Sequence, residues 1–246
     1  GAALSELRRF REASDAFDAA LRLNARVAPA HVGKGNALCE LESPAKALVA
    51  YDAALRIAPD LADGWLGRGH ALTDLARYDD ALSAYEKALQ IKPDLEAAYV
   101  GRGNVYLQTK RLAEALAQYE KALSLRPNAA IPRFSRGNVL YRMKRYDEAL
   151  ADYDAAMSLD AGLADAWLGA ANVHYKAGHF EDAASRYDKA LSLKPELADA
   201  WLGRGNVFNE VGRYDEALAD YDRALTIKPD LAAAWLNRGN VFYALK

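Results

Sequence analysis

The stretch LADAWLGRGNV at residues 197–207 decides the fold, because the chain repeats it at a fixed spacing. Close copies are LADGWLGRGH at 61–70, LADAWLGAAN at 163–172 and LAAAWLNRGN at 231–240. Trp167, Trp201 and Trp235 are therefore each 34 residues apart. A fixed period of this length indicates a repeat protein, in which each short unit packs mainly against its neighbours.

We number each repeat so that this tryptophan is its fourth residue. Complete repeats then run over 28–61, 62–95, 96–129, 130–163, 164–197 and 198–231, with partial repeats at 1–27 and 232–246. We therefore predict one elongated domain over residues 1–246. Because both ends stop partway through the motif, we interpret the chain as a fragment of a longer protein.

Each repeat contains two groups of apolar or small residues that recur every three or four positions, which predicts two amphipathic helices. In repeat 198–231 the break between them is at Gly212, and Pro229 ends the second helix. Small residues at positions 8 and 20 allow the paired helices to approach closely, and the aromatic at position 24 fills the space between them. The expected fold is an all-α stack of helix–turn–helix hairpins.

This pattern resembles the tetratricopeptide repeat family, whose 34-residue motif has tryptophan, a glycine four residues later, alanine at 20, an aromatic at 24 and proline at 32. Position 24 is Tyr51, Tyr85, Tyr119, Tyr153, Tyr187 and Tyr221, and position 32 is Pro59, Pro93, Pro127, Pro195 and Pro229. The resemblance covers the whole chain. It implies an α-solenoid, a right-handed superhelix whose first helices line a concave groove for a protein or peptide ligand.

The resemblance also implies that positions 2, 5, 9, 12 and 13 of the first helix face the groove, and helical geometry places them on one side. Position 9 is almost always asparagine: Asn36, His70, Asn104, Asn138, Asn172, Asn206 and Asn240. A column of side-chain amides can hydrogen-bond to the backbone of an extended peptide. The alternative is that each asparagine bonds within its own repeat.

Positions 5, 12 and 13 complete the predicted groove. Position 5 is apolar throughout: Val32, Leu66, Val100, Phe134, Leu168, Leu202 and Leu236. These residues form either an apolar stripe beside the asparagines or an ordinary buried part of each helix. Positions 12 and 13 vary most. In the central repeats, Phe134, Tyr141, Arg142, Tyr175 and Lys176 are predicted to anchor an aromatic or acidic peptide residue, the alternative being solvated variable positions.

Charges also repeat along the chain. Position 7 is basic in nearly every repeat and position 25 is acidic in every one. A row of phosphate-binding arginines is one interpretation. We favour a ladder between repeats, in which each basic residue pairs with the acid 16 residues earlier, as Arg68 with Asp52 and Arg204 with Asp188, because both signs repeat together.

Composition narrows the class of partner and the compartment. The formal net charge is −2, so nothing points to nucleic acid through bulk electrostatics. No apolar run is long enough to span a membrane. A single cysteine, Cys39, excludes an internal disulfide framework and fits a reducing compartment, which favours a cytoplasmic location.

The sequence contains no pattern typical of a catalytic site, so we predict a non-enzymatic protein without cofactor or metal. His174 and His179 lie five residues apart, a spacing that does not place two ligands on one helical face. We expect a packed His174 and an exposed His179 in the turn. Cys39 has no histidine partner by pattern and is not expected to act as a nucleophile.

The leading interpretation is therefore an interaction scaffold that binds an extended peptide or a helix. A second is the recognition arm of a larger enzyme, since the repeats are similar to those of O-linked N-acetylglucosamine transferases. The asparagine ladder of that group lies at position 6, which here is almost always glycine. A third is a scaffold that self-assembles through apolar residues left bare at its ends, namely Leu4, Leu7, Trp235, Val241 and Phe242.

Overall fold

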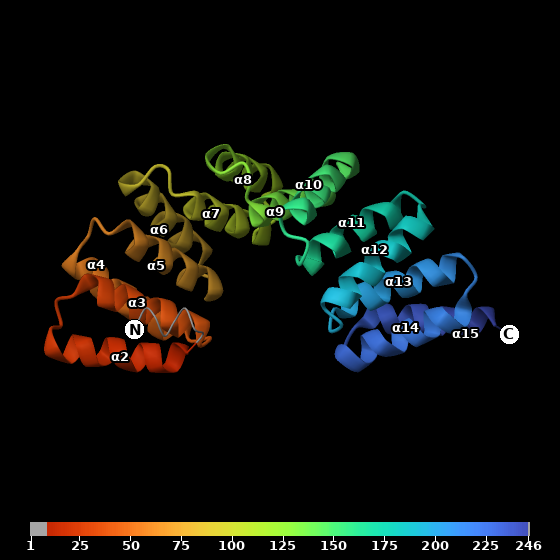
Figure 1. The fold of residues 1–246 in the computed structure, drawn as a ribbon, viewed down its shortest axis with the longest axis horizontal. Coiled ribbons are helices and arrows are strands. Elements are labelled where there is room, and N and C mark those ends of the chain that lie inside the picture. The colour runs from red at the N-terminus through yellow and green to blue at the C-terminus, as the bar shows by residue number, and fades with distance from the viewer. Residues whose placement is uncertain (1–8, 246) are drawn as a thin grey trace. The chain divides into compact units, whose positions relative to one another are not determined.

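The computed structural model describes residues 9–245, which form α-helices joined by short turns, with no strand among them. The helices follow one another as antiparallel hairpins (Figure 1). They fall into two compact units, residues 1–127 and 128–246. The architecture within each unit confirms the predicted all-α solenoid, while the single domain over 1–246 stays a prediction.

The helix bounds follow the repeat numbering. The first unit contains α2 (Phe10–Leu23), α3 (Ala28–Glu40), α4 (Pro44–Ile57), α5 (Ala62–Asp74), α6 (Tyr78–Ile91), α7 (Glu96–Gln108) and α8 (Leu112–Leu125). The second contains α9 (Ala130–Arg142), α10 (Tyr146–Leu159), α11 (Ala164–Lys176), α12 (Phe180–Leu193), α13 (Ala198–Glu210), α14 (Tyr214–Ile227) and α15 (Ala232–Ala244). Each complete repeat therefore begins with the first residue of its first helix, and its second helix spans positions 17–30.

The turn inside each hairpin is closed at position 15 by a residue with positive φ. Gly178 and Gly212 both have φ of 77°, a conformation that costs glycine little. Lys144 adopts φ of 61° at the same position despite its side chain. The next backbone N–H then returns to the last turn of the first helix, as where Arg213 donates to the Phe208 carbonyl at 2.8 Å.

The tyrosine at position 24 joins successive repeats. Tyr85 is 1% exposed and lies between Gly69 of its own repeat and Gly101 of the next. A Cβ atom at either glycine would lie 2.5 Å from the Tyr85 ring, so neither position has room for a side chain. Position 6 of the next repeat, Gly101, is therefore glycine because its helix sits directly on this ring.

A tryptophan at position 4 bonds its repeat to the preceding turn. The indole N–H of Trp65 donates to the Pro59 carbonyl at 2.8 Å, and Trp201 repeats the bond to Pro195. Where proline is missing, Trp167 donates to the Ala161 carbonyl at 3.2 Å. The bond needs only a backbone carbonyl, so it survives the loss of proline.

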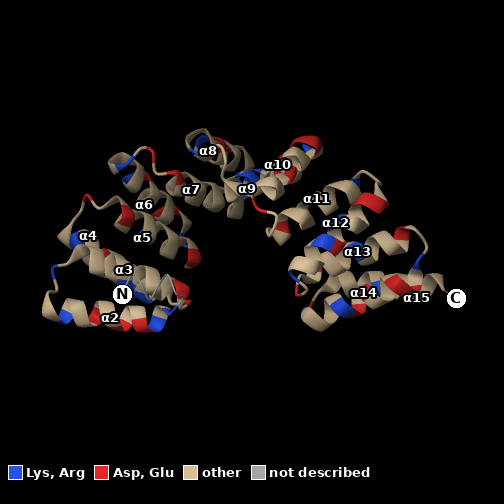
Figure 2. Cartoon of the chain, in the orientation of Figure 1, with Lys and Arg blue, Asp and Glu red and all other residues tan. Residues whose placement is uncertain are grey.

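Acidic and basic residues are interspersed along the helices of both units (Figure 2). Among the helices that the structure describes, none combines the length and the apolar character that a membrane span requires.

Candidate functional site

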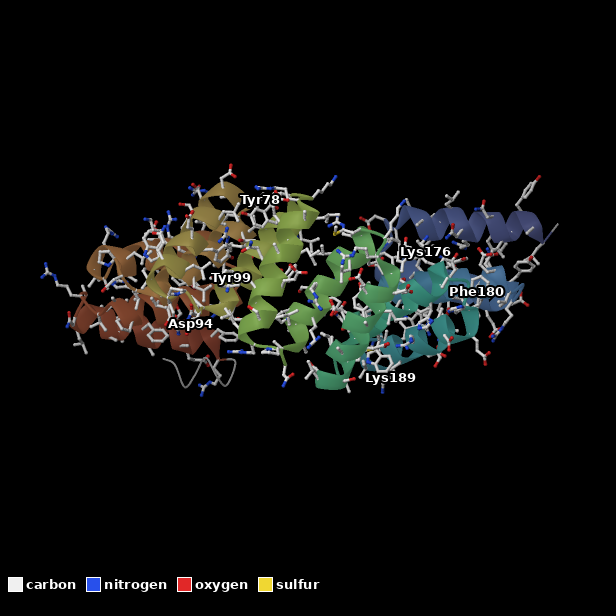
Figure 3. All side chains as sticks on the ribbon, turned by 90° about the horizontal axis from the view of Figure 1, so that it is seen from above. Tyr78, Asp94, Tyr99, Lys176, Phe180 and Lys189 are labelled. Atoms are coloured by element: carbon white, nitrogen blue, oxygen red, sulfur yellow. The ribbon has the colours of Figure 1, made fainter. Side chains whose placement is uncertain are left out.

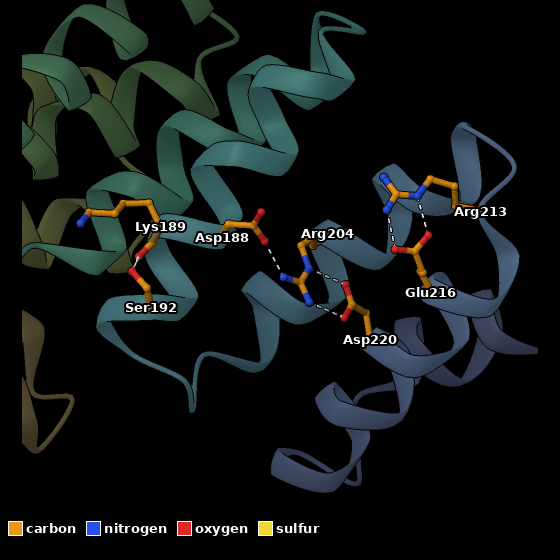
Figure 4. Close-up of polar contacts among 7 residues, drawn as sticks. All are labelled: Asp188, Lys189, Ser192, Arg204, Arg213, Glu216 and Asp220. Carbon is orange, nitrogen blue, oxygen red and sulfur yellow. Dashed lines mark hydrogen bonds and ion pairs between the residues drawn. The ribbon is translucent and has the colours of Figure 1, made fainter.

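The predicted ladder between repeats is present. The basic residue at position 7 pairs with the acid 16 residues earlier in Lys34–Asp18, Arg68–Asp52, Arg204–Asp188 and Arg238–Asp222, at 2.5–3.1 Å. Figure 4 shows the Arg204–Asp188 bond reaching from one hairpin to the next. These four basic residues are therefore paired with carboxylates of the preceding repeat, which confirms the ladder at these positions and disfavours the phosphate-binding row. Arg102 departs from it, since its Nε is buried without a hydrogen-bond partner among the described residues.

Two arginines of the second unit pair with an aspartate of their own repeat, which the sequence pattern does not show. Arg204 also donates two hydrogen bonds to Asp220, and Arg136 does the same to Asp152. The side chains of both aspartates are only 5% exposed. The bond to Asp220 raises the pKa of Arg204, while burial raises the pKa of Asp220 above its usual range. For the aspartate, desolvation therefore outweighs the attraction of its partner.

Repeat 164–197 rebuilds the ladder from a different position. Its position 7 is Ala170, which cannot pair, and Arg186 on α12 donates to Asp154 at 2.9 Å instead. The contact between acid and base is thus kept although the basic residue has moved from the first helix to the second.

The asparagines at position 9 lie on one face of the first helices, each beside its own tyrosine. Tyr153 donates to Asn138 Oδ1 at 2.8 Å, Tyr187 to Asn172 Oδ1 at 2.6 Å, and Tyr221 to Asn206 Oδ1 at 3.0 Å. Asn36 and Asn104 accept the same bond from Tyr51 and Tyr119 in the first unit. These asparagines therefore bond within their own repeat, as the alternative to peptide binding predicted. The bond uses the oxygen of the side-chain amide.

The other predicted residues of position 9 depart from this pattern. The His70 ring packs edge-on against Tyr85 with 5.6 Å between centroids, and Asn240 is exposed. Asn206 accepts a second bond from Asn237 Nδ2 at 2.7 Å. The apolar residues of position 5, among them Leu66, Val100, Phe134, Leu168 and Leu202, are half-buried rather than enclosed.

A hollow opens on this face of the second unit, between α9 and α11. It measures about 230 Å³ and is lined by Phe134, Asn138, Tyr141, Tyr153, Asp165, Leu168, Gly169 and Asn172. Five of the predicted groove residues, from positions 5, 9 and 12, therefore come together around one space. We call it the α9–α11 hollow.

The remaining predicted anchors lie at the end of α11. The Tyr175 ring packs against Phe180 at 5.9 Å between centroids, and its hydroxyl donates to Glu210 at 3.4 Å. Lys176 Nζ lies 5.9 Å from the Tyr175 ring centre. Figure 3 labels Lys176, the last residue of α11, and Phe180, the first residue of α12. Partial burial raises the pKa of Tyr175. Arg142, like Lys176, is exposed.

A larger hollow, about 750 Å³, lies between α4, α5 and α6 of the first unit. Its lining includes the Arg68–Asp52 ladder pair and Trp65. Because this pair of charges is already neutralised, we place the candidate site at the smaller α9–α11 hollow, whose lining combines Asn138 and Asn172 with apolar and aromatic side chains.

The expectation for the two histidines is only partly met. His174 is half-buried and His179 is exposed, as expected, yet the structure brings one ring nitrogen of each within 4.8 Å of the other and of an Asp182 oxygen. The argument from helical spacing was wrong here, because His179 lies beyond the end of α11 and the turn folds it back.

Two smaller expectations also have outcomes. Cys39 is half-buried, 3.7 Å from the Tyr51 hydroxyl, and burial raises the pKa of its thiol, which disfavours the reactive thiolate. The prediction that Val241 is bare is wrong, because its side chain is buried against Ala217 and Tyr221. Trp235 and Phe242 are exposed as expected, and Leu4 and Leu7 lie outside the described residues.

Solved structures with the same architecture are numerous. A chain of the APC/C hetero-tetramer Cut9–Hcn1 superposes with a TM-score of 0.88 at 16% identity, covering 98% of this chain and 47% of that chain. A tetratricopeptide repeat protein from Parabacteroides merdae gives 0.72 at 17% identity, covering 97% and 94%. This chain thus spans about half the length of the first, and both likenesses concern the fold alone.

A third structure is YrrB, described as a TPR protein with an unusual peptide-binding site. Its TM-score is 0.60 at 25% identity, covering 77% of this chain and 98% of that chain. No curated protein matches the chain.

Family models cover nearly the whole sequence. A tetratricopeptide repeat model matches residues 1–62, 168–232 and 212–246, and a TPR repeat model matches 69–110, 103–144 and 137–178. These matches agree with the repeat numbering, the helix bounds and the position-24 tyrosines. The chain therefore belongs to the tetratricopeptide repeat family.

Proposed function

We propose that the second unit binds an extended peptide along the face that carries the α9–α11 hollow. Tetratricopeptide repeat proteins generally mediate interactions between proteins, and their fold is typically a non-catalytic scaffold. The observation that carries the finer proposal is the convergence of Phe134, Asn138, Tyr141, Leu168 and Asn172 on one hollow.

The tyrosine bonds give the two asparagines a defined orientation. Because Asn138 and Asn172 each accept a tyrosine proton at Oδ1, their Nδ2 groups are left to donate. Two amide donors held one repeat apart suit the carbonyl groups of an extended backbone. The bond within the repeat and the peptide contact are therefore compatible, since they use opposite ends of the amide.

The hollow also limits what the peptide side chain can be. Its volume, about 230 Å³, lies below the roughly 300–1,000 Å³ of small-molecule pockets. Phe134, Tyr141 and Leu168 offer an apolar and aromatic lining, while Asp165, which also lines the hollow, repels an acidic group. We therefore favour an aromatic or large apolar anchor over an acidic one.

The test is a peptide selected from a random display library on the full chain, with its dissociation constant measured by fluorescence anisotropy. Asn138→Ala and Asn172→Ala should each weaken binding by roughly 3- to 10-fold, which is the loss of one hydrogen bond. Phe134→Ala should weaken it further by removing the apolar wall of the hollow.

Asn104→Ala is the matched control. It removes the same tyrosine–asparagine bond in the first unit, where Tyr119 donates to Asn104 at 2.6 Å, and should leave the affinity unchanged. Equal losses in Asn104→Ala and Asn138→Ala would show that the bond acts through stability and would refute the α9–α11 hollow as the site.

A second candidate function is self-association through α15. Trp235, Leu236 and Phe242 are exposed on this helix, and a second copy of the chain could cover them. Light scattering should then show a mass that rises with concentration, and Leu236→Lys should abolish the rise. A monomer mass at all concentrations would eliminate this candidate.

A further inference from the structure

Three potential metal ligands meet at the turn of repeat 164–197. His174 lies in the last turn of α11, His179 directly precedes α12, and Asp182 lies in the first turn of α12. A ligand atom of each lies within 4.8 Å of the others, and His174 Nδ1 lies 3.9 Å from Asp182 Oδ2. The two rings are 5.9 Å apart between centroids.

The same three positions hold a different cluster in other repeats. Position 16 is arginine and position 19 is acidic in the ion pairs Arg77–Asp80, Arg111–Glu114, Arg145–Glu148 and Arg213–Glu216. The arginine also covers an aromatic residue at position 11 where one is present, as Arg213 covers Phe208 at 4.4 Å. Figure 4 includes the Arg213–Glu216 pair.

Repeat 164–197 replaces both the arginine and the position-11 residue with histidine and keeps the acid. The fold therefore needs neither histidine at these positions, since its neighbours close the same turn with an ion pair. The nitrogen of His174 that faces Asp182 is Nδ1, and Nε2 on the other side of the ring is buried without a hydrogen-bond partner among the described residues.

We propose that His174, His179 and Asp182 bind a divalent transition-metal ion, with zinc as the best match. Two imidazole nitrogens and a carboxylate oxygen form a donor set that zinc prefers, leaving a fourth position for water. Tetrahedral zinc with bonds near 2.1 Å needs its ligands about 3.4 Å apart. The exposed His179 and Asp182 side chains can close the remaining distance by rotation.

The electrostatic surroundings are compatible with a cation. Arg186 lies near enough to act on the charge of His174, but it is paired with Asp154 at 2.9 Å. Asp182 supplies a negative charge within the site itself. The bound ion would join the end of α11 to the start of α12 across Ala177 and Gly178, and so fasten this one hairpin.

Isothermal titration of zinc chloride into the full chain, purified without a histidine tag and stripped with chelator, tests the proposal. We expect one zinc ion per chain and a thermal midpoint that rises with zinc concentration. Cobalt should replace zinc and give the visible absorption of a tetrahedral site. His179→Arg should weaken zinc binding at least about 100-fold, while offering Asp182 the ion pair that other repeats use.

Circular dichroism of His179→Arg checks its fold, and His179→Gln provides a second ligand deletion without a new charge. Cys39→Ser should bind zinc as the wild type does. Unchanged zinc affinity in both His179 variants, or zinc binding lost in Cys39→Ser, would overturn the proposal. So would the absence of saturable binding to the wild-type chain. None of these results depends on whether the α9–α11 hollow binds a peptide.

Discussion

Replacing Arg204 with methionine should destabilise the second unit far more than the same change at Arg68 destabilises the first. Each arginine pairs with the acid 16 residues earlier and lies over a tryptophan ring, so both variants lose those contacts. Only Arg204 also neutralises a carboxylate, Asp220, whose side chain is 5% exposed. Methionine would leave that carboxylate buried and unpaired.

The expected magnitudes follow from this difference in burial. Breaking a fully buried ion pair costs about 3–5 kcal/mol, and the 20% exposure of Arg204 lowers the expected cost to about 2–3 kcal/mol. Arg68→Met removes an interaction with a half-exposed Asp52 and should cost at most about 1 kcal/mol. Burial raises the pKa of Asp220 even with Arg204 in place, and because Arg204 lowers that pKa, its removal should raise it further.

Native-state hydrogen exchange of the full chain is the suitable assay, because repeats open partly independently and a single global midpoint mixes their stabilities. The amides of α13 and α14 should lose about 2–3 kcal/mol of protection in Arg204→Met. Adding Asp220→Asn should recover much of that loss by removing the stranded charge. If Asp220→Asn restores nothing, the cost does not come from the buried carboxylate and the reasoning fails.

Three further predictions concern the turn, the tyrosines and the asparagine orientation. Lys144→Gly should stabilise the chain by about 1 kcal/mol, because Lys144 has a φ of 61°, which costs glycine least. Gly178→Ala should destabilise the chain by a similar amount for the same reason. Urea unfolding midpoints that move in the opposite directions would contradict this. Burial raises the pKa of tyrosines such as Tyr187 and Tyr221 in the folded chain. The free energy of unfolding should therefore be unaffected by tyrosine ionisation below about pH 10, where these side chains are neutral in both states. Above that pH it should fall by about 1.4 kcal/mol per tyrosine and pH unit, because the unfolded chain ionises first. Absorbance titration should therefore show tyrosinate formation delayed until unfolding, and early, complete ionisation would refute it. Tyr153→Phe should weaken peptide binding about 2- to 5-fold, because it removes the hydrogen bond that orients the Asn138 amide. Fluorescence anisotropy measures this affinity, and an unchanged dissociation constant would contradict the prediction.

The repeat period made most of the fold predictable. Once Trp201 marked position 4, the helix starts and the tyrosine at position 24 followed, because every repeat solves the same packing problem. The ladder pairs such as Arg204–Asp188 could also be predicted, since both charges recur with the period. Because the same pattern recurs in every repeat, an exception in one repeat does not change the structure predicted from the others.

Features confined to one or two repeats could not be predicted in this way. Asp152 and Asp220 occupy position 23, where other repeats have alanine, glutamine or arginine, so no recurring signal marked their pairing. Helical spacing does not apply to His174 and His179, because a turn separates them and brings their ring nitrogens together. For the position-9 asparagines, the sequence left two roles open, and the bond to tyrosine within the repeat became visible only in three dimensions.

The most direct test of the peptide-binding account is nuclear magnetic resonance of the full chain with the selected peptide, observing the side-chain amides. The account predicts that the Nδ2 signals of Asn138 and Asn172 shift on binding, while that of Asn104 stays in place. Shifts confined to α15 or to the second helices, with the Asn138 and Asn172 amides unmoved, would contradict it.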